Sequence, residues 1–236
     1  MVDRVIYTLW TDNGNSFDKI LVSRDFFRKM AELSVWSAHN NFNNVELYAD
    51  KHGVDYITRE TNCKFTKINV IDFDQLEFDP SWWNYPKMHT YTLQEKPFIH
   101  VDFDVVMKER FSNQLHGADI YTEMIRSYAY SSFFHNNNVG KLPMPSGLIC
   151  SGLLGGESNA IFIENMKFAS KVVNRCDAQF YDVVGIEEYN LSALAEIKNM
   201  TVKPLDHDTF AHFQGQNKIE KYGHTINELH KTIFES

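Results

Sequence analysis

Blocks of apolar and polar residues alternate along the chain, and the spacing of the apolar positions switches between the periods of strands and helices. Apolar runs predict strands at Arg4 to Trp10, Asn44 to Ala49, Phe65 to Val70, Pro97 to Met107 and Thr201 to Leu205. Helical spacing appears between them, at about residues 23–40, 86–94 and 159–173. The first helix is expected to present one broad apolar face, formed by Phe26, Phe27, Met30, Leu33, Val35 and Trp36. Strands alternating with helices predict an α/β fold with a mostly parallel central sheet flanked by helices.

The rest of the chain gives no sign of a second domain. It contains no internal repeat, no low-complexity segment and no linker rich in Gly, Pro or Ser, so we predict a single domain over residues 1–236. With 43% hydrophobic and 14% aromatic residues, a chain of this length can fill a core. The formal net charge of −8 argues against a nucleic-acid partner, which needs a basic surface.

The cysteines and the N-terminal residues bear on location. Cys63, Cys150 and Cys176 are odd in number and lack metal-like spacing, so they predict reduced thiols in a cytoplasmic protein. No long apolar segment follows Met1 to Arg4, so we expect no signal peptide. No run approaches the ~18 apolar residues of a membrane span. Peripheral contact with a membrane stays open.

The motif Asp102-Phe103-Asp104 lies inside the apolar stretch from Pro97 to Met107. Alternate residues of a strand point the same way, so both carboxylates are expected to project together where the strand ends. Two carboxylates among apolar neighbours require a positive partner, and hard oxygen ligands suit Mg²⁺ or Mn²⁺ carrying a diphosphate. The alternative is a strand running into an Asp-rich turn, because this pattern is short.

A second segment, Ala211 to Lys218, combines residue types that suit a diphosphate site. His212 can complete a metal site begun by carboxylates. Gly215 lets backbone N–H groups approach phosphate oxygens, and Lys218 supplies a positive charge to a leaving phosphate. Taken alone, this segment also suits a turn with a solvent-facing lysine.

Three further segments carry candidate chemistry. Glu187 and Glu188 are expected in the first turn of a helix, where the helix dipole favours negative charge and one of them can face a pocket. The strand through Ser151 to Gly156 is punctuated by glycines, which permit close approach of a ligand or of another backbone. The aromatic segment 128–145 suits either a binding loop or a surface excursion.

Taken in order, these features resemble the glycosyltransferases of the GT-A fold. The motif His212-Phe213-Gln214-Gly215, with Lys218, is most similar to that of family 8, which includes glycogenin and the bacterial lipopolysaccharide galactosyltransferases. The resemblance implies a single-domain GT-A (Rossmann-like) fold. It also implies that Mn²⁺ (or Mg²⁺) is bound by Asp102, Asp104 and His212, and that Gly215 and Lys218 contact the diphosphate of the donor.

The chain departs from the family pattern at several places. Ile219-Glu220 follows Lys218 where the family has Pro-Trp, and Glu187-Glu188 replaces an Asp-Gln motif. Residues 45–50 and 81–87 look more like those of small uncharacterised bacterial or phage relatives than those of glycogenin. The motifs therefore favour the superfamily over any one family within it.

The implied activity is metal-dependent transfer of a hexose from a nucleotide-diphosphate sugar, expected to be a UDP-sugar, to an acceptor hydroxyl. The acceptor is a glycan, a lipid-linked molecule or a protein, and retention of anomeric configuration is implied by family 8. Catalysis is expected from Glu187, Glu188 and Lys218. The donor is expected to contact Thr8, Trp10, Lys87, Asp102, Gly215 and Lys218. Thr8 and Trp10 are included because ligands of such sheets lie beyond the carboxyl ends of the strands.

Two other function classes stay open. A nucleotidyltransferase of related fold also uses a metal and carboxylates, but usually carries a Gly-rich basic loop after its first strand. Residues 11–15 of this chain hold one Gly and no basic residue, which disfavours that class. A non-catalytic sugar-nucleotide-binding or scaffold protein would show no sugar-nucleotide hydrolysis even with Mn²⁺ present.

Overall fold

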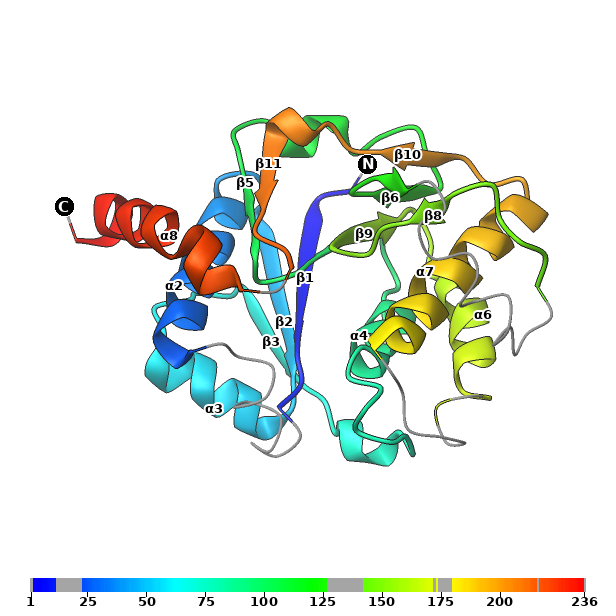
Figure 1. The fold of residues 1–236 in the computed structure, drawn as a ribbon, viewed down its shortest axis with the longest axis horizontal. Helices are drawn as coiled ribbons and strands as arrows, with labels where there is room; N and C mark the ends of the chain where they lie inside the picture. The colour runs from blue at the N-terminus through cyan, green and yellow to red at the C-terminus, as the bar shows by residue number, and fades with distance from the viewer. Residues whose placement is uncertain are drawn as a thin grey trace. The chain divides into compact units, whose positions relative to one another are not determined.

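A computed structural model describes residues 2–11, 23–126, 142–171, 173, 180–215 and 217–235. The chain groups into two compact units, each assembled from separate stretches of sequence. The first unit comprises Met1–Val2, Phe73–His100 and Leu115–Leu205; the second comprises Asp3–Asp72, Val101–Gln114 and Asp206–Ser236. Figure 1 labels the α-helices and most of the strands of both units. Cys176 and most of the aromatic segment 128–145 lie outside the described residues.

The first unit is built on a sheet of mixed direction. Its strand order is β10-β6-β9-β4, with β10 parallel and β9 antiparallel to β6. The strands of this unit are β4 (Phe98–Val101), β6 (Ile120–Thr122), β7 (Ile125–Arg126), β8 (Leu148–Ile149), β9 (Leu153–Gly156) and β10 (Val202–Pro204). Its helices are η2 (Phe73–Gln75), α4 (Tyr85–Thr92), α6 (Ala160–Ala169) and α7 (Phe180–Ile197). Helix α6 packs against both α4 and α7.

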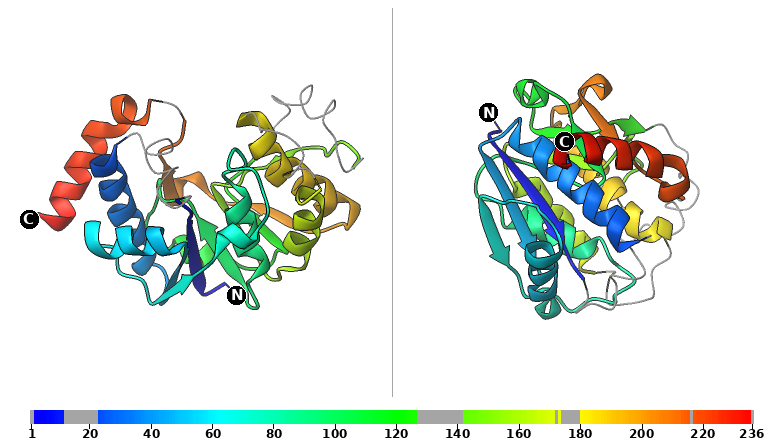
Figure 2. Two further views of the ribbon diagram at one scale, coloured as in Figure 1. Left: turned by 90° about the horizontal axis from the view of Figure 1, so that it is seen from below. Right: turned by 90° about the vertical axis from the view of Figure 1, so that its left-hand side faces the viewer.

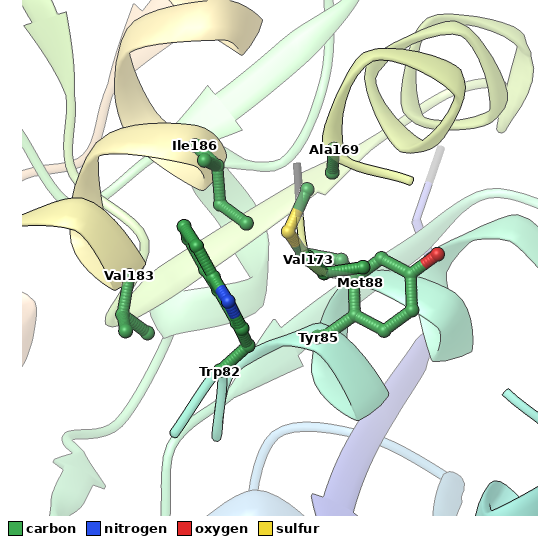
Figure 3. Close-up of a cluster of buried hydrophobic side chains, with 7 residues drawn as sticks. All are labelled: Trp82, Tyr85, Met88, Ala169, Val173, Val183 and Ile186. Carbon is green, nitrogen blue, oxygen red and sulfur yellow. The ribbon is translucent and has the colours of Figure 1, made fainter. Parts of the chain in front are cut away.

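A buried apolar cluster joins these three helices. In Figure 3 the indole of Trp82 lies between Ile186 and Val183 of α7 and the side chain of Met88 on α4. Trp82 is 2% exposed and stands just before α4 in the sequence. Its burial therefore anchors the start of α4, the helix that carries Lys87.

The second unit is built on a parallel sheet of order β1-β2-β3, in which β1 and β3 each pair with β2. A separate antiparallel pair joins β5 to β11. The strands are β1 (Arg4–Leu9), β2 (Asn44–Ala49), β3 (Lys67–Val70), β5 (Val105–Met107) and β11 (Phe210–His212). The helices are α2 (Arg24–His39), α3 (Lys51–Glu60), η3 (Phe111–Gln114), η4 (His207–Thr209) and α8 (Lys218–Phe234).

Helix α8 lies along α2, as Figure 1 and the right-hand view of Figure 2 both show. The contact has an apolar part that includes Met30 of α2 and Ile226 of α8. It also has a buried ionisable pair, in which a ring nitrogen of His230 bonds to the carboxylate of Glu32. Both partners are buried, so either one left alone would be a costly unpaired polar group.

The α/β class, with mostly parallel strands flanked by helices, is confirmed, while the single domain stays a prediction. The single strand predicted from Pro97 to Met107 is wrong. β4 ends at Val101, β5 begins at Val105, and the residues between them form a turn closed by a 3.1 Å hydrogen bond from the Val105 N–H to the Asp102 carbonyl. The motif therefore sits in the Asp-rich turn that was the alternative interpretation.

Three details of the helices also differ from the predictions. Helix α7 begins at Phe180, so Glu187 and Glu188 lie inside it and away from its first turn. Trp36 is 41% exposed, so the apolar face of α2 is narrower than expected. The residues after Asp50 form helix α3, which was not predicted, and the Asp50 carboxylate caps its start. Among the described residues, no helix has the length and apolar character needed to cross a membrane.

Candidate functional site

The turn between β4 and β5 is anchored by its middle residue. Phe103 is 9% exposed, and its ring lies 4.9 Å from that of Tyr7 on β1 and 5.4 Å from that of Phe27 on α2. This packing fixes the turn, and with it the backbone of Asp102 and Asp104 on either side. Asp102 accepts the turn-closing bond through its carbonyl oxygen.

The β5–β11 pairing brings the late histidine to the same place. His212 pairs with Val105, so the end of β11 lies beside the start of β5. The N–H of Phe213 donates to the Asp104 carbonyl at 2.8 Å, and the Phe213 ring joins the apolar contact between α2 and α8. As a result, Nε2 of His212 lies 3.4 Å from Oδ1 of Asp104.

Lys218 completes this group from the first position of α8. Its Nζ donates to Oδ2 of Asp104. The backbone leading to it is left-handed at Gly215, with φ of 98°, and at Asn217, with φ of 59°. Since left-handed backbone favours glycine, Gly215 is suited to this bend for a conformational reason.

The electrostatics of the group centre on Asp104. Burial alone would raise the pKa of this carboxyl, but hydrogen bonding with His212 and the positive charge of Lys218 outweigh it and hold the pKa well below its usual range. Asp104 is therefore a carboxylate at neutral pH, although its side chain is only 12% exposed.

The donor atoms of this group suit a divalent cation in kind, since carboxylate oxygen and imidazole nitrogen are common ligands of Mn²⁺. Two of the three predicted ligands, Asp104 and His212, lie together. Among the residues that the structure describes, however, no group of three or more His, Cys, Asp or Glu side chains could hold a metal ion. In this arrangement Lys218 takes up one carboxylate oxygen of Asp104.

The two predicted glutamates lie in the first unit, on α7, and their partners differ. Glu187 accepts a 2.7 Å hydrogen bond from the Tyr91 hydroxyl and a 3.3 Å bond from Nδ2 of Asn84. Nζ of Lys87 lies 3.6 Å from the same carboxylate and donates to the Ser151 carbonyl at 2.8 Å. Glu187 is thus tied to helix α4 by neutral donors and one cation.

Glu188 bonds instead to the turn between β8 and β9. The N–H and hydroxyl of Ser151 donate to its Oε1 at 3.1 and 3.3 Å. Burial raises the pKa of Glu188 to about 7, and the neighbouring charge of Glu187 adds to this, while Arg126, Ser151 and Lys87 oppose it. A buried carboxyl of this kind changes protonation state near neutral pH, a property common in groups that exchange protons with a ligand.

The glycine-punctuated strand has a packing explanation. A Cβ added at Gly155 would lie 2.1 Å from the Phe98 carbonyl oxygen, and one at Gly156 would lie 2.7 Å from the Asp119 carbonyl oxygen. These glycines allow neighbouring backbone to approach, which was one of the two interpretations of this segment.

The remaining predicted donor contacts lie at the carboxyl end of β1. Thr8 is half-buried on the strand, and Trp10, just beyond its end, is 8% exposed. Sequence reasoning missed Asp50, which binds Thr11 next to Trp10, and it missed Tyr91 and Asn84 beside Glu187. The sequence did contain a signal for the capping role of Asp50, because Asp is a common N-cap residue just before a helix.

The chain belongs to a family of unknown function, DUF6734, whose model matches residues 3–234. A search of curated proteins finds no match. Among solved structures, the chain is similar to the galactosyltransferase LgtC in complex with donor and acceptor sugar analogues, with a TM-score of 0.53 and 11% identity over 98% of this chain and 96% of that one. It is equally similar to the inositol-1-phosphate CTP transferase from T. maritima, with a TM-score of 0.53 and 9% identity over the same shares. Mouse xyloside xylosyltransferase 1 matches at a TM-score of 0.48 and 14% identity, over 99% and 94% of the two chains. The chain shares the fold of the first two, which confirms the Rossmann-like α/β class.

Proposed function

We propose that the chain is a metal-dependent glycosyltransferase that moves a hexose from a nucleotide-diphosphate sugar, with UDP-sugar as the donor, to an acceptor hydroxyl. The observation that carries the proposal is the convergence of Asp104, His212 and Lys218 from a turn, a strand end and a helix start. These are the residues that the resemblance assigned to metal and diphosphate binding. The fold shared with a galactosyltransferase is consistent with this activity.

In the proposed reaction, the bond between the anomeric carbon and the diphosphate oxygen breaks, and a bond to the acceptor oxygen forms with retention of configuration. The acceptor hydroxyl, on a glycan, lipid-linked molecule or protein, gives its proton to the Glu188 carboxylate or to the departing diphosphate. Negative charge builds up on the departing diphosphate, and Lys218 with the N–H groups near Gly215 would stabilise that charge. Asp104 and His212 already lie together, and with Asp102 they would hold Mn²⁺ or Mg²⁺ once Lys218 leaves Asp104 for the diphosphate of the donor. The metal would supply Lewis-acid stabilisation of the same leaving group.

In this proposal, the other predicted residues contact the donor or the acceptor. Thr8 and Trp10 would contact the nucleoside, and Lys87 the sugar or a phosphate. Glu188 would accept or return a proton at a sugar or acceptor hydroxyl, which its pKa of about 7 favours. Glu187, held by Tyr91 and Asn84, would orient hydroxyl groups.

The experiment is a thermal-shift panel of UDP-, GDP-, CMP- and ADP-linked sugars, each with and without Mn²⁺. A ligand that binds only the folded chain raises its melting temperature by mass action. We expect metal-dependent stabilisation by UDP-sugars, followed by release of UDP when acceptors are added. No stabilisation by any sugar nucleotide would overturn the proposal and favour a scaffold protein.

A nucleotidyltransferase is the second candidate, since the chain is equally similar in fold to a CTP transferase. Adding CTP and UTP to the same panel separates the two. Stabilisation by a free nucleoside triphosphate with release of pyrophosphate, and none by sugar nucleotides, would favour this second function.

A further inference from the structure

Asp50 bonds to the chain on both sides of Trp10. Its own N–H donates to the Leu9 carbonyl at 3.3 Å, just before Trp10. Its Oδ2 accepts a 2.6 Å hydrogen bond from the N–H of Thr11, just after Trp10. Asp50, in the connection between β2 and α3, therefore restrains the backbone on both sides of Trp10.

The Thr11 side chain strengthens this connection. Its hydroxyl lies 2.9 Å from both carboxylate oxygens of Asp50. Thr11 is fully buried and Asp50 is 8% exposed. Hydrogen bonds to a buried carboxylate are stronger than neutral ones, so this contact resists local motion more than an ordinary turn does.

The same carboxylate caps helix α3, because Oδ1 accepts a 2.6 Å bond from the N–H of Gly53. A Cβ at position 53 would lie 3.0 Å from that oxygen and 3.1 Å from the Leu9 carbonyl oxygen. The close approach of β1 to α3 thus depends on a glycine. By contrast, the cap of α2 is Ser23, whose side chain accepts one bond, from Phe26 at 3.0 Å. Asp50 does more than a helix cap requires.

We infer that Asp50 is a positioning residue that holds Trp10 ready to contact the nucleoside of the donor. The inference rests on the proposed function, which places Trp10 against that part of the ligand. A side chain ordered before binding loses less conformational freedom on binding, so affinity for the nucleoside gains from Asp50 without direct contact.

The test uses Asp50→Asn and Thr11→Val in the full chain. Asparagine is also a favourable cap, so α3 keeps its N-cap, but its NH₂ group cannot accept the bond from Thr11. Thr11→Val removes the hydroxyl and keeps the shape. Ser23→Ala is the matched control, since the bond that it removes, from the N–H of Phe26, lies within α2 and its cap. Binding of UDP and of pyrophosphate, both with Mn²⁺, is measured by calorimetry.

We expect Asp50→Asn to weaken UDP binding about tenfold and Thr11→Val to weaken it less, with pyrophosphate binding unchanged in both. Ser23→Ala should leave both affinities unchanged. A purely structural role for Asp50 would weaken UDP and pyrophosphate binding together, and that result would overturn the inference. Unchanged UDP binding in both variants would overturn it as well.

A second readout needs no ligand. Labelling with fluorotryptophan gives one ¹⁹F signal for each of the four tryptophans, and Trp10→Phe identifies the signal of Trp10. Asp50→Asn should shift that signal and leave those of Trp36, Trp82 and Trp83 in place; an unmoved Trp10 signal contradicts the positioning role. Absence of any nucleotide binding by the wild-type chain would instead overturn the proposed function, and with it the nucleoside role of Trp10.

Discussion

The Nζ atom of Lys218 donates to Oδ2 of Asp104, a residue 114 positions earlier in the chain. The bond joins the start of α8 to the turn before β5, and both side chains are largely removed from solvent. The pair therefore contributes to the fold of the second unit as well as to the proposed leaving-group chemistry.

We predict that Lys218→Met weakens UDP binding by tenfold or more, about 1.4 kcal/mol, because the diphosphate loses its positive partner. In the ligand-free chain, a double-mutant cycle with Asp104→Asn should give a coupling of roughly 1–3 kcal/mol by denaturant unfolding. The control is Lys231→Met, an exposed lysine in the last turn of the same helix. Equal effects of the two lysine variants on UDP binding would contradict the role of Lys218.

The hydrogen bond from Tyr91 to Glu187 predicts that removing the Tyr91 hydroxyl lowers the free energy of unfolding more than removing the hydroxyl of another buried tyrosine, Tyr7. Tyr91→Phe removes a donor from a buried carboxylate and should lower the free energy of unfolding by roughly 2 kcal/mol. Tyr7→Phe is the matched control, because the Tyr7 hydroxyl meets the neutral hydroxyl of Ser34 at 3.0 Å, and its loss should lower the free energy by about 1 kcal/mol. Urea unfolding of both variants measures the difference, and a smaller loss in Tyr91→Phe would refute it.

The raised pKa of Glu188 predicts that the stability of the chain depends on pH. Its folded-state pKa of about 7 lies above the unfolded value of 4.5, so between these pH values the unfolded chain releases a proton that the folded chain keeps. Stability should therefore fall as pH rises through this window, by roughly 3 kcal/mol from this group.

The corresponding variant is Glu188→Gln, which keeps an oxygen for Ser151 and removes the charge. We expect it to be more stable than wild type at pH 8 and nearly equal to it at pH 4.5, measured by denaturant unfolding at each pH. Glu164→Gln in α6 serves as the control, because the Glu164 side chain is 38% exposed. A parallel pH curve for wild type and Glu188→Gln would disprove the effect.

The glycines of β9 and α8 predict opposite effects of alanine. Gly155→Ala places a Cβ within 2.1 Å of a backbone oxygen that cannot move without shifting β4, so we expect a loss of roughly 3 kcal/mol or failure to fold. Gly223→Ala, inside α8, meets its nearest neighbour at an ordinary 3.5 Å and should gain about 0.5–1 kcal/mol. Thermal unfolding of both variants decides between this account and a ligand-facing role for Gly155.

Much of the fold could be predicted because the apolar spacing is local. The bounds of β2 match the prediction, β1 is one residue shorter at its C-terminal end, and α2 is one residue shorter at each end. The turn at Asp102 to Asp104 was only the alternative interpretation, because apolar residues on both sides of it continue the strand pattern. Helix α3 was missed because Gly53 resembles the end of an element, whereas here it makes room for β1.

The candidate site was predictable in its residue types and less so in its contacts. The late motif pointed to His212 and Lys218, and the structure brings both to Asp104 through the β5–β11 pairing. No local pattern reveals that Lys218 would bind the carboxylate, since this depends on residues far apart in the sequence. The partners of Glu187 and Glu188 were hidden for the same reason.

The order in which the second unit is assembled has a consequence during synthesis. Its last stretch, from Asp206 onward, carries β11, His212, Lys218 and α8, whereas every strand and helix of the first unit precedes it. A nascent chain that has reached Leu205 can complete the first unit, but β5 still lacks its partner strand and Asp104 lacks both basic neighbours. If domains fold as their residues emerge, the proposed donor site cannot form on the ribosome until the residues from Asp206 through α8 have been translated.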